Sequence, residues 1–246
     1  MVWQARIVTL FPEMFPGPLA HSLAGRSLRN GVWHLSTTQI RDFASDKHRS
    51  VDDNAYGPNV GMVLKADVVH NALAAAVDQF HGTPQILFMT PKGVLLTQHV
   101  VRKLAQSDGV VILCGHYEGV DDRVIKFWKS AHNLQEISLG DYILSGGEVA
   151  ALALVDSCVR LLPGVVHNKN SLVQESFELA LLEFPQYTRP YEWQGAKVPE
   201  ILLSGNHKAI AAWQQEQAEE ITRICRPDLW ELYINQKKNK TCAEDV

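Results

Sequence analysis

Hydrophobic residues along this 246-residue chain form either short continuous runs or stretches with helical spacing. Residues 6–11, 85–89, 110–114 and 137–139 are mostly apolar and have the length of short buried strands. Residues 66–80 instead carry valine, leucine, alanine and phenylalanine at three- and four-residue spacing, which predicts an amphipathic helix. The alternation of strands and helices predicts an α/β fold with a parallel, doubly wound sheet.

Local signals predict further elements in the first two thirds of the chain. Thr97 has the side chain of a helix N-cap and precedes valine and leucine residues at helical spacing. Residues 147–162 are nearly all apolar and predict a buried helix that stops at a Pro-Gly pair. Residues 34–40 predict another strand. Residues 41–61 lack an apolar period, and a polar loop of that length inside a compact domain usually has a function.

The character of the chain changes near residue 165. We predict an α/β domain over residues 1–165, a flexible linker over 166–176 and a small all-helical C-terminal domain over 177–246. The polar tail from residue 236 is expected to fray. The helices predicted in the last part cover residues 177–184, 207–224 and 227–234.

Two of the predicted strands end in loops rich in glycine. The runs 110–114 and 137–139 lead into residues 115–119 and 140–148, and each loop carries carboxylate and tyrosine side chains. Ligands of an open α/β sheet bind beyond the carboxyl ends of its strands, and glycine lets the backbone approach a ligand closely. The sequence therefore predicts a small-molecule site with a wall made of backbone atoms.

Composition excludes several classes of protein. The formal net charge of −4 argues against a general polyanion binder, although residues 26–49 are locally basic and could bind nucleic acid or form an ordinary solvated surface. Cysteine and histidine residues lack zinc-site spacing. Cys114 and Cys158 lie in apolar runs, which indicates reduced core residues. No apolar run has the roughly 18 residues of a membrane span, and the N-terminus does not resemble a signal peptide, so we expect a cytoplasmic protein.

Familiar catalytic and phosphate-binding motifs are missing from the sequence. Ser145 does not lie in a G-x-S-x-G elbow, which argues against a hydrolase. The glycine loops match neither a dinucleotide fingerprint nor a Walker P-loop. A ligand without a phosphate group fits them better.

Short motifs are spread over almost the whole chain. They are Thr9-Leu10-Phe11-Pro12-Glu13-Met14-Phe15, Arg41-Asp42-Phe43, Asp46-Lys47-His48-Arg49, Val51-Asp52-Asp53, Gly115-His116-Tyr117-Glu118-Gly119-Val120-Asp121, Ser138-Leu139-Gly140-Asp141-Tyr142-Ile143-Leu144-Ser145-Gly146-Gly147-Glu148, Asp156-Ser157, Pro163-Gly164-Val165, Tyr187-Thr188-Arg189-Pro190 and Leu202-Leu203-Ser204-Gly205-Asn206-His207. In this order they resemble the bacterial tRNA (guanine-N1)-methyltransferases, a family of the knotted SPOUT superfamily. The resemblance extends to about residue 230, and the blocks 140–148 and 203–207 are its most diagnostic parts.

The resemblance implies a SPOUT domain with a deep trefoil knot whose loops bind S-adenosylmethionine, the methyl donor. Tyr117 and Tyr142 could instead be ordinary core aromatics, and Gly140 and Gly146 could serve only tight turns. Carried over residue by residue, the cofactor-binding positions are Thr90, Pro91, Gly115, Tyr117, Glu118, Gly119, Ser138, Leu139, Gly140, Asp141, Tyr142, Ile143, Leu144, Gly146 and Gly147.

The implied reaction is methyl transfer to N1 of the guanosine at tRNA position 37, next to the anticodon. The chemistry needs a base for the N1 proton and a cation for the charge that develops on O6. Glu175 occupies the position of the family's catalytic aspartate and could alternatively be a helix-start carboxylate. Arg160 corresponds to the family's catalytic arginine and could also pair with Asp156.

The family also implies a tRNA partner and a homodimer, with each site shared between two subunits, and it is linked to a magnesium requirement. One departure is Tyr56-Gly57-Pro58-Asn59-Val60-Gly61-Met62, where Pro58 and Asn59 replace two glycines. Two alternatives stay open: a knotted methyltransferase with another RNA target, and a family member that binds cofactor and RNA with weak catalysis. The candidate RNA-binding residues are Arg26, Arg41, Lys47, His48, Arg49 and Asp52.

Overall fold

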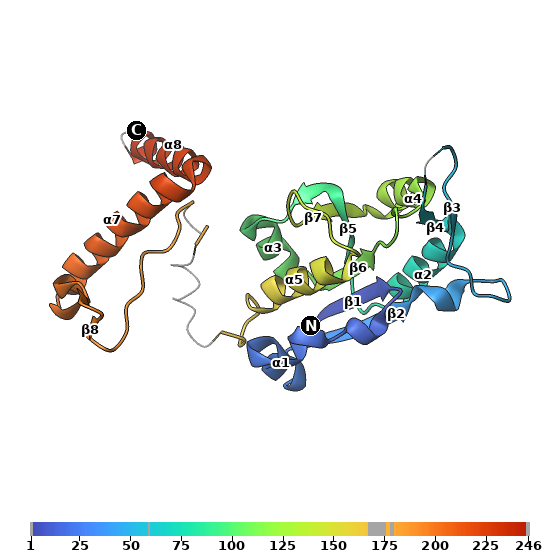
Figure 1. Cartoon of the computed structure of the whole chain (residues 1–246), viewed down its shortest axis with the longest axis horizontal. Coiled ribbons are helices and arrows are strands. Elements are labelled where there is room, and N and C mark those ends of the chain that lie inside the picture. Colours follow the sequence, from blue (N-terminus) through green and yellow to red (C-terminus); the bar gives the residue numbers. More distant parts are fainter. Residues whose placement is uncertain (1, 59, 167–175, 178–179, 245–246) are drawn as a thin grey trace. The chain divides into compact units, whose positions relative to one another are not determined.

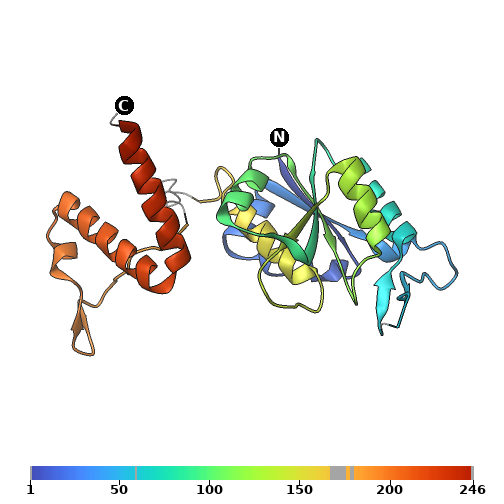
Figure 2. The same ribbon diagram turned by 90° about the horizontal axis from the view of Figure 1, so that it is seen from above.

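A computed structural model describes residues 2–58, 60–166, 176–177 and 180–244. The contacts divide the chain into two compact units, Met1–His167 (unit 1) and Asn168–Val246 (unit 2). Both are drawn in Figures 1 and 2, and each is described by itself.

Unit 1 is built on a five-stranded parallel sheet with the strand order β2-β1-β6-β5-β7. The predicted α/β architecture with a parallel sheet is therefore confirmed. The chain first adds β2 beside β1, then crosses to β5 and returns to place β6 between β1 and β5. The strands are β1 (Trp3–Thr9), β2 (Trp33–Gln39), β5 (Gln85–Leu95), β6 (Gly109–Cys114) and β7 (Gln135–Ser138).

The central strand β6 is buried along its whole length. Val110, Ile112 and Cys114 point into one hydrophobic cluster, whereas Val111 and Leu113 point into the other. Successive side chains of a strand face opposite sides of the sheet. Because both sides are covered, the strand appears in the sequence as an uninterrupted apolar run.

Helices cover both faces of the sheet. Figures 1 and 2 show α3 and α5 on one face and α2 and α4 on the other. Helix α4 was not predicted, although the Asp121 side chain caps it by accepting from the backbone N–H of Arg123 at 2.9 Å. The α-helices of unit 1 are α1 (Ser22–Arg29), α2 (Ala66–Asp78), α3 (Gln98–Ala105), α4 (Asp122–His132) and α5 (Glu148–Val159). The short 3-10 helices are η1 (Pro12–Met14), η2 (Gly17–Ala20) and η3 (Ile40–Phe43).

Helix α5 is the most deeply buried helix of unit 1. Ala151, Leu154 and Val155 have no exposed surface. The helix is shorter than predicted, because Arg160 forms its C-cap and a turn follows before the Pro-Gly pair. Its first residue, Glu148, comes directly after the last glycine-rich loop, so the packing of α5 fixes the position of that loop.

The prediction of a single polar loop over residues 41–61 was partly wrong. β3 (Asp52–Asn54) pairs in antiparallel fashion with β4 (Met62–Leu64). Strands of three residues are too short to show a period-2 pattern, and Asp52 and Asp53 have low strand propensity. Backbone hydrogen bonds to a neighbouring loop hold this hairpin in place, as described below.

Unit 2 contains two packed helices, α7 (His207–Cys225) and α8 (Pro227–Glu244), with η4 (Glu200–Leu203) before them. Asn206 caps α7 by accepting from the backbone N–H of Ala209 at 3.2 Å. Since α8 continues to Glu244, the frayed tail was a wrong expectation.

Unit 2 also departs from the all-helical prediction in two places. A short hairpin pairs β8 (Glu192–Trp193) with β9 (Ala196–Lys197) around a tight turn at Gln194 and Gly195, both of which have positive φ. The expected helix over residues 177–184 is wrong for its described part. Residues 180–184 are not helical, and Ala180 has a φ of 58°, which no right-handed helix contains.

Leu154→Ala should lower the free energy of unfolding by about 3 kcal/mol, because it leaves a cavity between α5 and the sheet. Leu23→Ala, at a half-exposed position of α1, is the matched control and should cost less than about 1 kcal/mol. Urea unfolding followed by circular dichroism measures both values. Equal losses in the two variants would contradict the central place of α5 in the core.

Candidate functional site

A cavity of about 480 Å³ lies at the carboxyl ends of β5, β6 and β7. This is the edge of the sheet where the sequence predicts a ligand. Except for Asp141, every residue that the resemblance assigns to the cofactor lines this cavity. Asp141 is exposed in the same loop without lining the cavity.

Three chain segments form the cavity wall: residues 88–92, 115–120 and 136–147. The first segment lies within β5, whose pairing with β7 shifts register between Met89 and Val94. Thr90 and Pro91 lie in this irregular part of the strand. The other two segments are the glycine-rich loops after β6 and β7, so backbone atoms contribute much of the wall.

The two glycine-rich loops touch directly. The backbone N–H of Gly147 donates to the carbonyl oxygen of Gly115 at 2.9 Å. A Cβ atom at residue 147 would lie 2.8 Å from Cα of Cys114. This distance is shorter than any ordinary contact between carbon atoms, so only glycine allows α5 to begin against the end of β6.

Aromatic and aliphatic side chains of the wall are exposed in the chain. Tyr117 is 48% exposed, Tyr142 is 55% exposed and Ile143 is 80% exposed. The two tyrosines are therefore not core residues, and the alternative that they are ordinary core aromatics is ruled out. Exposed apolar groups around a cavity are the usual signature of a surface that a ligand or another protein covers.

The cavity also has charged side chains that were not predicted as site residues: Lys92, Asp122 and Glu136, in addition to the predicted Glu118. Asp122 pairs with Lys126 at 2.7 Å, and the hydrogen bond from Lys126 lowers the pKa of Asp122. Glu136 pairs with Lys129. His116 lines the cavity as well. The cavity wall thus carries three carboxylates, of which Asp122 and Glu136 are paired with lysines outside the wall, together with the cationic side chain of Lys92.

The loop after β6 is bonded to the β3–β4 hairpin. The N–H groups of Glu118 and Asp121 donate to the carbonyl oxygens of Met62 and Leu64 at 3.0 and 3.1 Å, and the N–H of Leu64 donates to Gly119 at 3.0 Å. Gly61, with a φ of +119°, lies against Glu118, where a Cβ atom would be 2.3 Å from Cγ of that residue. The hairpin and the cavity loop therefore form one continuous structure.

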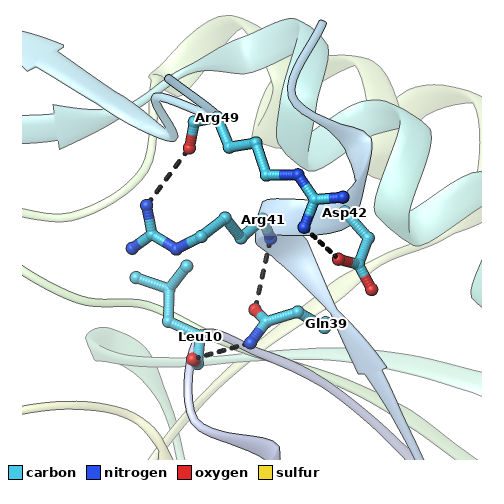
Figure 3. A network of polar contacts seen from close by, with 5 residues as sticks. All are labelled: Leu10, Gln39, Arg41, Asp42 and Arg49. Atoms are coloured by element: carbon cyan, nitrogen blue, oxygen red, sulfur yellow. Dashed lines mark hydrogen bonds and ion pairs between the residues drawn. The ribbon is translucent and has the colours of Figure 1, made fainter. Parts of the chain in front are cut away.

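Four of the candidate RNA-binding residues are exposed: Arg41 lies in η3, and Lys47, His48 and Arg49 lie on the segment between η3 and β3. Figure 3 shows how side chains hold this segment. Arg41 donates through Nη1 to the carbonyl oxygen of Arg49 at 3.1 Å, and Arg49 pairs with Asp42 at 3.4 Å. The side-chain amide of Gln39 accepts from the backbone N–H of Arg41 through Oε1 and donates through Nε2 to the carbonyl oxygen of Leu10.

Asp46 organises the turn inside this segment. Its carboxylate accepts from the backbone N–H groups of His48 and Ser50 and from the Ser50 hydroxyl at 2.9 to 3.0 Å. Desolvation acts in the opposite sense, but these hydrogen bonds prevail and lower the pKa of Asp46. The segment is thus a shaped turn that presents Lys47 and His48 to solvent.

The other two candidate RNA-binding residues lie elsewhere. Asp52 is the first residue of β3. Arg26 lies on α1, which precedes the amino end of β2, whereas the exposed basic segment follows the carboxyl end of that strand. Figure 1 shows α1 and the segment that follows η3 at opposite ends of unit 1. Arg26 therefore does not share a surface patch with the other basic residues.

Arg160, one of the two candidate catalytic residues, does not line the cavity of this chain. Arg160 is the partly buried C-cap of α5, whereas the cavity lies at the beginning of that helix. Twelve residues of helix separate the two ends, which corresponds to about 18 Å. Glu175 lies outside the described residues, as does most of the predicted linker.

The family model of the tRNA (Guanine-1)-methyltransferase TrmD matches residues 3–232. The chain belongs to this family. A tRNA (guanine-N(1)-)-methyltransferase of Brucella canis is 58% identical over 236 residues, which cover 96% of this chain and 93% of that protein. The protein of the same name from Brucella ovis is 57% identical, with 96% and 95% covered.

Membership of the tRNA (guanine-1)-methyltransferase family agrees with the position of the cavity. The motifs that are most diagnostic of the family, residues 140–148 and their neighbours, form one of its walls. Within the described part of the chain, no helix is long and apolar enough to cross a membrane. Over the same residues, no group of three or more His, Cys, Asp or Glu side chains could hold a metal ion.

Gly61→Ala should loosen the contact between the hairpin and the cavity loop, because the added methyl group collides with Glu118. The amides of Glu118 and Asp121 should then exchange with deuterium at least about tenfold faster. Gly57→Ala is the matched control: it also has a positive φ, but its added Cβ atom meets nothing within 4 Å. Hydrogen exchange with mass spectrometry gives the comparison, and equal rates in both variants would disprove the link.

Proposed function

We propose that this protein transfers a methyl group from S-adenosylmethionine to N1 of the guanosine at position 37 of tRNA. The observation that carries the proposal is the cavity at the ends of β5, β6 and β7, in a chain of the tRNA (guanine-1)-methyltransferase family. Relatives with this name cover nearly the whole chain at 57–58% identity.

The cavity fits S-adenosylmethionine in its chemistry. Exposed Ile143 and Tyr142 offer apolar surface to an adenine ring. Glu118 and Asp122 offer negative charge to the amino and sulfonium groups. The glycine-rich loops present backbone N–H and C=O groups, which suit the donors and acceptors of the adenine edge. These features support the predicted cofactor residues, whereas the trefoil knot stays a prediction of the family resemblance.

The reaction requires a base and a cation. When bound, S-adenosylmethionine supplies a methyl group on a positively charged sulfur. The new bond joins that methyl carbon to guanine N1, while the sulfur keeps the electron pair of the broken bond. Glu175 is the proposed acceptor of the N1 proton. Arg160 is the proposed partner of guanine O6, where negative charge develops.

A homodimer accounts for the position of Arg160. This residue is about 18 Å from the cavity along α5, too far to act on a base held in the cavity of the same chain. In a symmetric dimer, one subunit can supply the cavity while the other supplies Arg160 and Glu175. The exposed apolar wall around Ile143 and Leu144 also favours a covered surface in the assembly.

The tRNA would reach the cavity past the β3–β4 hairpin and the basic segment that follows η3. Lys47, His48 and Arg49 could contact phosphates, and the hairpin would lie near the flipped guanine because it is bonded to the cavity loop. Arg26, on α1, would contact the RNA apart from this segment, and unit 2 would contribute further contacts. A cytoplasmic location stays a prediction from the sequence pattern, and a magnesium requirement stays a prediction of the family resemblance.

A methyl-transfer assay tests the proposal. Purified protein, labelled S-adenosylmethionine and tRNA transcripts with guanosine or adenosine at position 37 are incubated under single-turnover conditions, and the modified nucleoside is mapped. We expect 1-methylguanosine at position 37 of the first transcript alone. Methylation at another nucleotide would favour a different RNA target, and bound cofactor without product would favour a binding protein.

Glu175→Gln should abolish turnover, because the amide cannot accept the N1 proton, and should leave cofactor affinity within about twofold of wild type. Rapid-quench kinetics and calorimetric titration measure the two quantities. Glu183→Gln, at another carboxylate of unit 2, serves as the control and should retain activity. A wild-type rate in Glu175→Gln would show that the base lies elsewhere.

Lys47→Ala should weaken tRNA binding and reduce the slope of log affinity against log salt concentration by about one. The reason is the loss of one phosphate contact and its released counterion. Lys103→Ala on α3 is the charge-matched control and should leave the slope unchanged. Filter binding at several salt concentrations measures both slopes. Identical slopes in the Lys47→Ala and Lys103→Ala variants would show that Lys47 does not contact the RNA.

A further inference from the structure

Glu148 is a buried carboxylate to which the proposed chemistry gives no role. It is 2% exposed, and among the residues that the structure describes it is the one charged side chain in the core. A carboxylate without compensation in such a place costs several kcal/mol. A buried carboxylate in this position, directly after the cavity loop, therefore needs partners that stabilise it.

Three groups stabilise this carboxylate. The hydroxyl of Thr9, which is fully buried, donates to Oε1 of Glu148 at 2.7 Å. The same hydroxyl accepts from the backbone N–H of Phe11 at 2.9 Å, so its proton is directed to Glu148. Nε2 of His116 lies 3.5 Å from Oε2. Glu148 is also the first residue of α5, where the helix dipole favours negative charge.

His116 connects this carboxylate to the cavity. It lies in the loop after β6, lines the cavity and is one-fifth exposed at the side chain. Its ring packs against Phe11 at 4.8 Å and against Tyr117 at 5.5 Å between centroids. Tyr117 is the next wall residue and has a φ of 57°. The orientation of its side chain therefore depends on the conformation of the loop after β6.

The position of Gly146 independently supports the contact between His116 and Glu148. Its backbone forms an isolated antiparallel bridge with His116. A Cβ atom at residue 146 would lie 2.4 Å from Nε2 of His116 and 2.5 Å from Oε2 of Glu148. The loop before α5 is therefore shaped around the pair of side chains, and only glycine leaves room for both.

We propose that Glu148 is a positioning residue that acts through His116 and sets the spacing of the two glycine-rich loops around the methyl donor. The Thr9–Glu148–His116 chain joins the end of β1, the loop after β6 and the start of α5, three segments far apart in sequence. This inference rests on the proposed function, since it assigns S-adenosylmethionine to the cavity.

The substitution Glu148→Gln keeps the shape of the side chain and the acceptor for Thr9 while removing the charge opposite His116. We expect the dissociation constant for S-adenosylmethionine to rise about tenfold. The KM for S-adenosylmethionine should rise in the same proportion, while kcat at saturating cofactor stays within about twofold, because no reacting group has changed. His116→Asn should give a similar increase.

The double variant Glu148→Gln/His116→Asn separates a shared role from two independent ones. If the residues act as a unit, the double variant binds S-adenosylmethionine about as weakly as either single variant. If the increase in the dissociation constant of the double variant equals the product of the two single increases, the proposal that Glu148 acts through His116 is overturned. Should Glu148→Gln fail to fold, His116→Asn decides alone, since this side chain is partly exposed. Unchanged affinity in that variant would then overturn the proposal.

Ser27→Ala is the control for a general loss of buried polar contacts. Its hydroxyl is buried on α1 and accepts from Nε1 of Trp33 at 3.1 Å, away from the cavity. It should lower the melting temperature without changing cofactor affinity. Wild-type affinity in folded Glu148→Gln would overturn this inference alone, whereas wild-type protein that binds no S-adenosylmethionine would overturn the proposed function as well.

Discussion

The hydrogen bond between Gly147 and Gly115 is the contact on which the rest of the site depends. It brings the start of α5 against the end of β6, at a distance that no side chain allows. Because β6 is buried along its whole length and α5 packs most of its residues into the core, the two glycine-rich loops have little freedom to separate. The cavity is thus shaped by the core and not by the loops alone, which suits a site that must hold a reactive group precisely.

The same arrangement explains how charge is distributed. Three carboxylates and Lys92 line the cavity, whereas the exposed basic residues after η3 lie on the segment that leads into the hairpin bonded to the cavity loop. Under the proposed function, a cationic methyl donor and a polyanionic RNA would meet different parts of one continuous structure. Arg160, at the other end of α5, would under the same proposal complete the chemistry at the cavity of a second subunit. The proposed function therefore needs one chain for cofactor binding and a dimer for methyl transfer.

The sequence predicts the sheet and the cavity because their signals are local. Strand β6 is a continuous apolar run since both of its faces are covered, and glycine marks the loops at the strand ends. Helix α4 also had a signal that was missed: Val124, Ile125 and Trp128 lie at helical spacing after a capping aspartate. The contact of Thr9 with Glu148 spans 139 positions in the sequence and has no local signature. The short strands of the hairpin and the left-handed Ala180 likewise depend on tertiary contacts.

Hydrogen exchange with and without S-adenosylmethionine tests most directly whether the cavity holds the methyl donor. The account predicts that the cofactor slows exchange of backbone amides in residues 88–92, 115–120 and 136–147, and that the hairpin residues 61–64 follow because they are bonded to the second of these segments. Protection confined to other parts of the chain, with these three segments unchanged, would contradict it.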